Sequence, residues 1–117
     1  MLVVDDDAAL RMLCRVNLEL DGYKVLEAEG VDEAAEYLED ERVDVVLLDV
    51  HMGDNLKGGL GLLGRLEGRV PRPAVALLTG SMDTLRFEKP AGVDAILTKP
   101  FALDELARLV EGLAGRM

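Results

Sequence analysis

The stretch VDVVLLD at residues 43–49 carries the strongest pattern in the sequence and decides the fold class. Apart from its two aspartates it consists only of valine and leucine. A nearly continuous run of such residues is typical of a parallel strand that is covered by helices on both faces. The stretch therefore predicts a buried parallel strand that ends on a carboxylate, Asp49.

Apolar runs and amphipathic segments alternate on both sides of this stretch. Further strands are expected at Met1–Val4, Tyr23–Ala28, 74–79 and Asp94–Thr98. Helices are expected at 8–20, 32–41, Leu60–Leu66 and Leu103–Ala114. Strand and helix alternate five times, which predicts an α/β fold with a doubly wound, five-stranded parallel sheet. A fourth helix belongs between residues 80 and 92, and we expect it to be short because Pro90 interrupts it.

Helical periodicity supports the first and last helices. Leucines and a valine recur close to the helical period in the first helix, at Leu10, Leu13, Val16 and Leu20. The last helix carries an apolar stripe that is expected to face inward, made of Leu103, Leu106, Ala107, Val110, Leu113 and Ala114.

The composition argues against several classes of protein. Residues 1–117 are short enough for one domain. The formal net charge of −10 argues against direct binding to nucleic acid and against adhesion to an anionic membrane. Cys14 is the only cysteine, which excludes an internal disulfide and fits a reducing compartment. No signal peptide or long apolar segment is visible, so a cytoplasmic location is expected.

The stretch GLGLLG at residues 59–64 matches the G-x-G-x-x-G pattern of dinucleotide-binding folds. It follows the third expected strand rather than the first, and no acid ends a strand ~20 residues further on, as that motif requires. A flavodoxin-like or dinucleotide-binding enzyme is therefore the weaker alternative. Gly61 and Gly64 each disfavour a helix by up to ~1 kcal/mol relative to alanine. We expect a weak start to the third helix and a mobile loop over residues 53–59.

Polar residues stand at the carboxyl ends of the expected strands, where open parallel sheets bind ligands. They are Asp5, Asp6, Asp49, Thr79 and Lys99. Each alone also fits an ordinary role as a helix cap, a turn residue or a solvated charge. Together, three carboxylates repel one another unless a cation joins them, and Mg²⁺ takes such oxygen ligands. Thr79 and Lys99 could then hold a phosphoryl group on Asp49, the candidate nucleophile.

Four motifs in this order resemble those of response-regulator receiver domains of two-component systems. They are LVVDDD at 2–7, VDVVLLD at 43–49, ALLTG at 76–80 and LTKPF at 97–101. The resemblance covers essentially the whole chain. It implies a flavodoxin-like (βα)5 fold with strand order 2-1-3-4-5. Because no output domain follows the last helix in this sequence, we expect a receiver that acts alone through partner contact, or one excised from a longer protein.

The resemblance also implies a function for the acidic residues. Asp49 would accept a phosphoryl group from a phosphohistidine on a sensor histidine kinase or a histidine phosphotransfer protein. Asp5 and Asp6 would hold Mg²⁺, with Asp6 favoured as the direct ligand, and His51 would lend its backbone carbonyl. Such a domain switches its binding to a downstream protein, and it is not an enzyme beyond its own phosphorylation and slow dephosphorylation.

The resemblance assigns Thr79 as the switch hydroxyl and Lys99 as the phosphate-binding lysine, preceding a commonly cis proline, Pro100. Three features depart from the family pattern. Gly53 stands where the family usually has proline, and the fourth helix is short. Ile96 occupies a switch position where tyrosine or phenylalanine is usual. These departures motivate a second hypothesis beside the phosphorylatable receiver, a degenerate receiver that acts as a constitutive interaction module.

Overall fold

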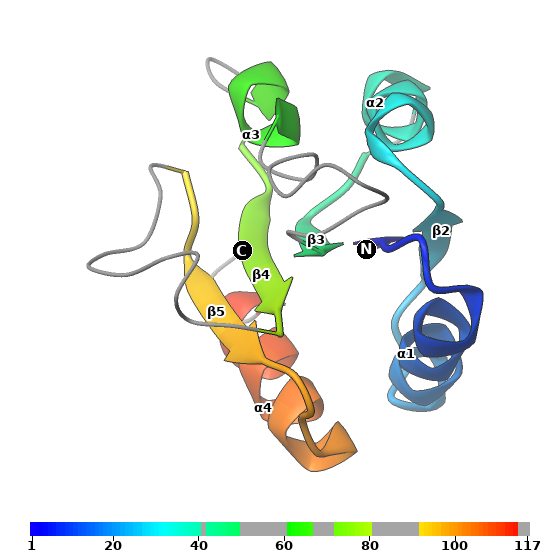
Figure 1. The fold of residues 1–117 in the computed structure, drawn as a ribbon, viewed down its shortest axis with the longest axis vertical. Coiled ribbons are helices and arrows are strands. Elements are labelled where there is room, and N and C mark those ends of the chain that lie inside the picture. The colour runs from blue at the N-terminus through cyan, green and yellow to red at the C-terminus, as the bar shows by residue number, and fades with distance from the viewer. Residues whose placement is uncertain (41, 50–60, 67–71, 81–91, 115–117) are drawn as a thin grey trace.

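The structure is a computed structural model that describes residues 1–40, 42–49, 61–66, 72–80 and 92–114 (Figure 1). The strands are β1 (Leu2–Val4), β2 (Leu26–Ala28), β3 (Val45–Asp49), β4 (Ala74–Thr79) and β5 (Ala95–Thr98). The helices in the described ranges are α1 (Ala8–Leu20), α2 (Val31–Asp40), α3 (Gly61–Leu66) and α4 (Leu103–Ala114).

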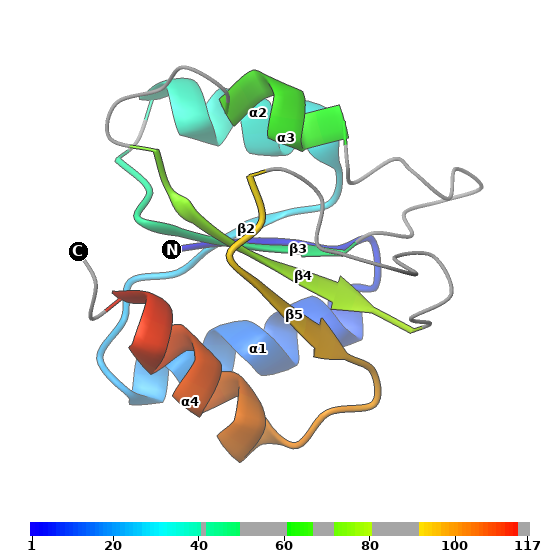
Figure 2. The ribbon, with the colours of Figure 1, turned by 90° about the vertical axis from the view of Figure 1, so that its left-hand side faces the viewer.

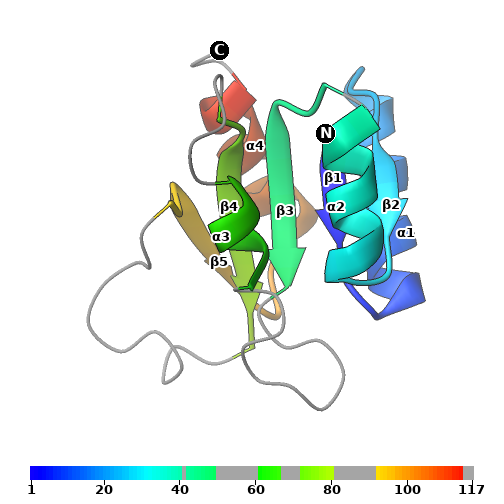
Figure 3. The same ribbon diagram turned by 90° about the horizontal axis from the view of Figure 1, so that it is seen from above.

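The five strands form one parallel sheet in the order β2-β1-β3-β4-β5 (Figure 3). Helices α1 and α4 cover one face of the sheet, and α2 and α3 cover the other (Figure 2). The doubly wound parallel sheet and its strand order are confirmed. The short fourth helix expected near Pro90 and the mobile loop expected over residues 53–59 lie outside the described residues.

The sheet separates the core into two layers, and the central strand β3 contributes side chains to both. Val46 and Leu48 pack on the side of α2 and α3, and Val45 and Leu47 pack on the side of α1 and α4. Every residue of β3 is buried, as the VDVVLLD stretch predicts. Burial on both faces explains why this strand carries no alternation of polar and apolar residues.

Helix α1 begins and ends where the periodicity predicts, but of the periodic apolar residues only Leu10 packs against the core. Its fully buried residues are Cys14 and Leu18, one turn apart, whereas Leu13, Val16 and Leu20 are exposed. Helix α4 buries Leu106, Val110 and Leu113 as expected, but Leu103 is exposed. None of the helices in the described ranges combines the length and apolar character needed to cross a bilayer.

Candidate functional site

Three carboxylates meet at the carboxyl edge of the sheet. Asp5 directly follows β1, and Asp49 is the last residue of β3, which is the neighbouring strand. One carboxylate oxygen from each of Asp5, Asp6 and Asp49 lies within 4.8 Å of the others. Asp5 and Asp49 are buried, and Asp6 is exposed. The structure therefore brings together the three acids that the sequence placed at strand ends.

The three consecutive aspartates before α1 make different contacts. The Asp5 carboxylate accepts a hydrogen bond from the backbone N–H of Asp7 at 2.9 Å. The Asp7 carboxylate caps α1 by accepting from the N–H groups of Ala9 and Leu10. Asp6 lies between them and is the exposed member of the carboxylate cluster. The turn is thus fixed locally from both sides of Asp6.

Lys99 supplies a cation to this cluster. Its Nζ lies 3.4 Å from Oδ2 of Asp5 and 3.5 Å from Oδ1 of Asp49. The backbone N–H of Lys99 donates to the carbonyl of Thr79 at 2.7 Å, which ties the end of β5 to the end of β4. The Lys99–Pro100 peptide is cis, as the sequence resemblance implies. Lys99 therefore joins the two buried carboxylates.

Three further residues were predicted to belong to the site: Thr79, Ile96 and His51. Thr79 is fully buried at the end of β4, next to β3 and β5 in the sheet. Ile96 lies on β5 and is partly buried against the core layer of α2 and α3. His51 lies outside the described residues, so its predicted carbonyl ligand stays a prediction.

Arg11 also reaches this turn, although no sequence motif marks it. Its Nη1 donates to the backbone carbonyl of Asp5 at 2.7 Å, and its Nε donates to Glu27 at 3.0 Å. An arginine on the first helix is common as a solvated charge, so its position alone gave no signal. Only the packing of α1 against β2 brings Arg11 and Glu27 together.

The donor set fits a hard divalent cation. All three side chains offer oxygen atoms, which Mg²⁺ prefers over nitrogen or sulfur. Among the described residues, the three carboxylates and the Lys99 ammonium leave a formal excess of negative charge that a divalent ion would neutralise. The exposure of Asp6 leaves the cluster accessible from solvent.

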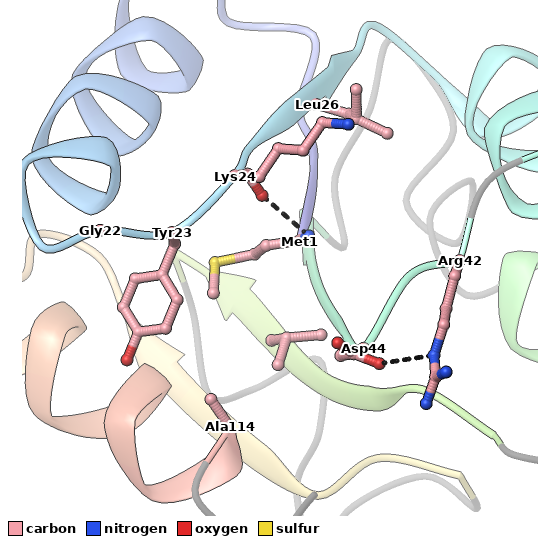
Figure 4. A pocket seen from close by; sticks show the side chains of 9 residues that line it. Met1, Gly22, Tyr23, Lys24, Leu26, Arg42, Asp44 and Ala114 are labelled. Carbon is pink, nitrogen blue, oxygen red and sulfur yellow. Dashed lines mark hydrogen bonds and ion pairs between the residues drawn. The ribbon is translucent and has the colours of Figure 1, made fainter.

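A separate cavity of about 380 Å³ lies at the opposite, amino-terminal edge of the sheet (Figure 4). Its charged groups include the Met1 amine, Lys24, Arg42 and Asp44. The amine donates to the carbonyl of Lys24 at 3.0 Å, and burial lowers the pKa of this amine. The cavity contains none of the predicted site residues and is unrelated to the carboxylate cluster.

Comparison with known proteins agrees with this geometry. Residues 1–111 match the family model of the response regulator receiver domain. The chain is 37% identical over 112 residues to the transcriptional regulatory protein KdpE of Mycobacterium tuberculosis, covering 93% of this chain and 48% of that protein. It is 33% identical over 120 residues to the phosphate regulon transcriptional regulatory protein PhoB of Pseudomonas aeruginosa, covering 99% and 52%. The chain thus spans about half the length of these regulators.

Solved structures show the same fold. A CheY-like response regulator receiver domain protein from Methanospirillum hungatei superposes with a TM-score of 0.82 at 31% identity, covering 97% of this chain and 92% of that one. The response regulator TrrA of Thermotoga maritima, solved in complex with Mg²⁺ and BeF, gives a TM-score of 0.83 at 29% identity, with 96% of each chain covered. The sheet order, the carboxylate cluster and these matches lead to one conclusion: the chain belongs to the response regulator receiver domain family of two-component systems.

Proposed function

We propose that this receiver is phosphorylated on Asp49 in a Mg²⁺-dependent reaction and that phosphorylation switches its binding to a protein partner. The observation that carries the proposal is the buried Asp49 carboxylate, with Lys99 at 3.5 Å and two further carboxylates within 4.8 Å. The TrrA structure contains Mg²⁺ and BeF in a receiver of the same fold, which supports the same ligand chemistry here.

In the proposed reaction, a carboxylate oxygen of Asp49 attacks the phosphorus of a phosphohistidine on a sensor histidine kinase or a histidine phosphotransfer protein. The new O–P bond makes an acyl phosphate while the N–P bond to the donor imidazole breaks, and the imidazole keeps the electron pair. Lys99 offsets the negative charge of the phosphoryl oxygens, and the hydroxyl of Thr79 donates to one of them. The chain is thus a phospho-acceptor and not an enzyme that turns over a separate substrate.

Asp5, Asp6 and Asp49 would hold Mg²⁺, and the backbone carbonyl of His51 is the further ligand that the family resemblance implies. When bound, the ion supplies positive charge that neutralises the carboxylates and the phosphoryl oxygens. Burial of Asp5 and Asp49 strengthens this requirement, because charges removed from water need a counter-charge nearby.

The downstream partner is proposed to be a protein. The proposed location of this interaction is the cytoplasm. The formal net charge of −10 supports a protein partner, since direct nucleic-acid binding by this chain would require basic charge. Thr79 lies on β4 beside β5, so a movement of its hydroxyl toward a phosphoryl group would be passed to the β5 side of the sheet.

The test is incubation with Mg²⁺ and a small phosphodonor, followed by intact mass measurement. One added phosphoryl group is expected on the wild type and none on Asp49→Asn. Asp44→Asn is the matched control, because Asp44 precedes the same strand but lies at the other end of the sheet. No phosphorylation of the wild type, or phosphorylation that persists in Asp49→Asn, would refute the proposal.

A degenerate receiver that binds its partner constitutively is the second candidate. The observation that favours it is Ile96, a partly buried aliphatic residue packed on the core where the family usually has an aromatic switch residue. Amide NMR spectra with and without beryllofluoride separate the two candidates. Shifts that spread from the carboxylate cluster to β5 support a working switch, and shifts confined to the cluster support the degenerate module.

A further inference from the structure

Arg11 links the carboxylate turn to the edge of the sheet. Its side chain is only 11% exposed, although it lies on the surface helix α1. One arm, Nη1, donates to the backbone carbonyl of Asp5 at 2.7 Å. The other arm, Nε, donates to Oε1 of Glu27 on β2 at 3.0 Å. The guanidinium therefore bridges the turn that follows β1 and the neighbouring strand β2.

Glu27 also forms an ion pair with a second arginine. Arg15, one turn further along α1, places its Nε 2.6 Å from Oε2 of Glu27. Arg15 also pairs with Glu19 at 3.2 Å on its own helix. Each oxygen of the Glu27 carboxylate thus faces a different arginine. Of the two arginines, Arg11 is the one that donates to Asp5.

The carbonyl that Arg11 holds belongs to the peptide that leads into Asp6. A peptide unit is planar, so fixing the carbonyl oxygen of Asp5 also fixes the direction of the N–H and the Cα of Asp6. Asp5 is further restrained because its N–H donates to the carbonyl of Ala28 at 3.1 Å. Asp6 is the exposed member of the cluster, and its side chain leaves the backbone directly after the peptide whose carbonyl Arg11 holds. The direction in which the Asp6 side chain starts is therefore set in part by the backbone that Arg11 restrains.

We propose that Arg11 is a positioning residue for the divalent cation: it holds the Asp5–Asp6 peptide so that the Asp6 carboxylate faces Asp5 and Asp49, and Glu27 holds Arg11. The inference rests on the proposed function, because it assumes that these carboxylates bind Mg²⁺. The rigid planar fork of arginine suits this role, since two donors at a fixed angle reach two acceptors at once. A lysine offers one flexible point charge and cannot reproduce both contacts.

A charge effect and a positioning effect of Arg11 would change the Mg²⁺ affinity in opposite directions, and this difference tests the proposal. Arg11 carries a positive charge close to a cation site, so a role through charge alone would make its removal strengthen Mg²⁺ binding. A positioning role makes the same removal weaken Mg²⁺ binding. Loss of groups that orient metal ligands costs roughly 10- to 100-fold in affinity, which exceeds the expected effect of one partly neutralised charge.

The experiment measures the Mg²⁺ dissociation constant of the unphosphorylated protein by calorimetry and amide NMR. Arg11→Gln is expected to weaken binding by about 10-fold or more. Arg15→Gln is the matched control, because it also removes a contact to Glu27 but leaves the Asp5 carbonyl held; less than about a two-fold change is expected. Arg11→Lys keeps the charge, is the variant of choice if Arg11→Gln does not fold, and is expected to weaken binding several-fold.

Binding by Arg11→Gln or Arg11→Lys that equals or exceeds that of the wild type would overturn the proposal. Equal weakening by Arg15→Gln would also overturn it, because the effect would then belong to Glu27. A wild type that binds Mg²⁺ but accepts no phosphoryl group would refute the proposed function alone and leave the comparison of the arginines valid. A wild type that binds no Mg²⁺ would refute both.

Discussion

The ammonium of Lys99 lies 3.4 Å from Oδ2 of Asp5, although the two residues are 94 positions apart in sequence. The same Nζ lies 3.5 Å from Asp49, so one cation serves two buried carboxylates at the ends of β1 and β3. This arrangement makes the charge balance of the site part of the stability of the fold.

Replacing Lys99 by methionine should destabilise the protein when Mg²⁺ is absent. Asp5 and Asp49 would keep their burial and lose their counter-charge, and we expect a loss of ~1–3 kcal/mol, below the range for a fully buried pair because the Lys99 side chain is 26% exposed. Mg²⁺ should restore more stability to the variant than it adds to the wild type. Urea unfolding followed by circular dichroism, with and without Mg²⁺, measures both; an equal increment would contradict the expectation.

Two leucines on α1 should differ sharply in their contribution to stability. Leu18 is 1% exposed and Leu20 is 79% exposed. Leu18→Ala removes buried methyl groups and leaves a cavity, so a loss of ~2–5 kcal/mol is expected. Leu20→Ala deletes the same methyl groups where they are exposed to solvent, and it should change the free energy of unfolding by less than ~0.5 kcal/mol. Similar losses in chemical denaturation would show that the buried face of α1 is misplaced.

Asp94, which directly precedes β5, should contribute to the stability of the fold. Its Oδ2 accepts from the backbone N–H of Val75 at 2.8 Å, and its Oδ1 lies 3.4 Å from Arg72. Asp94→Ala would leave the N–H of a buried residue without this acceptor, with an expected loss of ~1–3 kcal/mol. Asp104→Ala is the control, since its exposed pair with Arg108 should contribute less than ~1 kcal/mol. The measurement is thermal unfolding of both variants in the same buffer. Equal decreases in Tm for Asp94→Ala and Asp104→Ala would contradict the role given to Asp94.

The Cys14 thiol should make stability fall at alkaline pH. Burial, reinforced by the nearby Asp5 carboxylate, raises the pKa of Cys14 to about 11 from an ordinary value of 9.0. Between these values the unfolded chain loses the thiol proton while the folded chain keeps it, so rising pH favours unfolding. Relative to Cys14→Ala, the wild type should lose ~2 kcal/mol between pH 9 and pH 11. The measurement is urea unfolding of both proteins across this range, and parallel pH profiles would rule out the shift.

The strand ends were the most predictable part of the molecule. Asp49 and Thr79 were expected to close their strands, and both do. Long aliphatic runs that stop at a polar residue leave little freedom in where a buried parallel strand ends. Since parallel strands place their carboxyl ends at one edge, the convergence of Asp5, Asp49 and Lys99 followed from the order of the elements.

The face that α1 buries could not be predicted from periodicity. Leu10, Leu13, Val16 and Leu20 follow the helical period, but Cys14 and Leu18 also lie one turn apart. Apolar residues therefore cover more than one side of this helix, and the choice is made by tertiary contacts. The ion pairs from Arg11 and Arg15 to β2 are part of that choice.

The contacts of Arg11 could not be read from the sequence for a similar reason. Arg11 and Glu27 are 16 positions apart, and nothing in the intervening sequence marks the pair. Tyr23–Val25 were expected in β2, but the strand begins at Leu26, because its partner β1 pairs only with Leu26–Ala28. Pairing length and side-chain partners are set by the neighbouring element and not by local propensity.

The reach of Lys99 across the chain also orders events during protein synthesis. A ribosome produces Asp5 and Asp49 well before it produces β5, so the emerging chain carries the acids without their ammonium. β5 is an edge strand that pairs only with β4 among the described strands, so it adds to a sheet whose other members are already made. The nascent protein gains the Lys99 ammonium at its carboxylate cluster only when β5 docks, and under the proposed function the competence to hold a phosphoryl group would be a property of the fully assembled sheet.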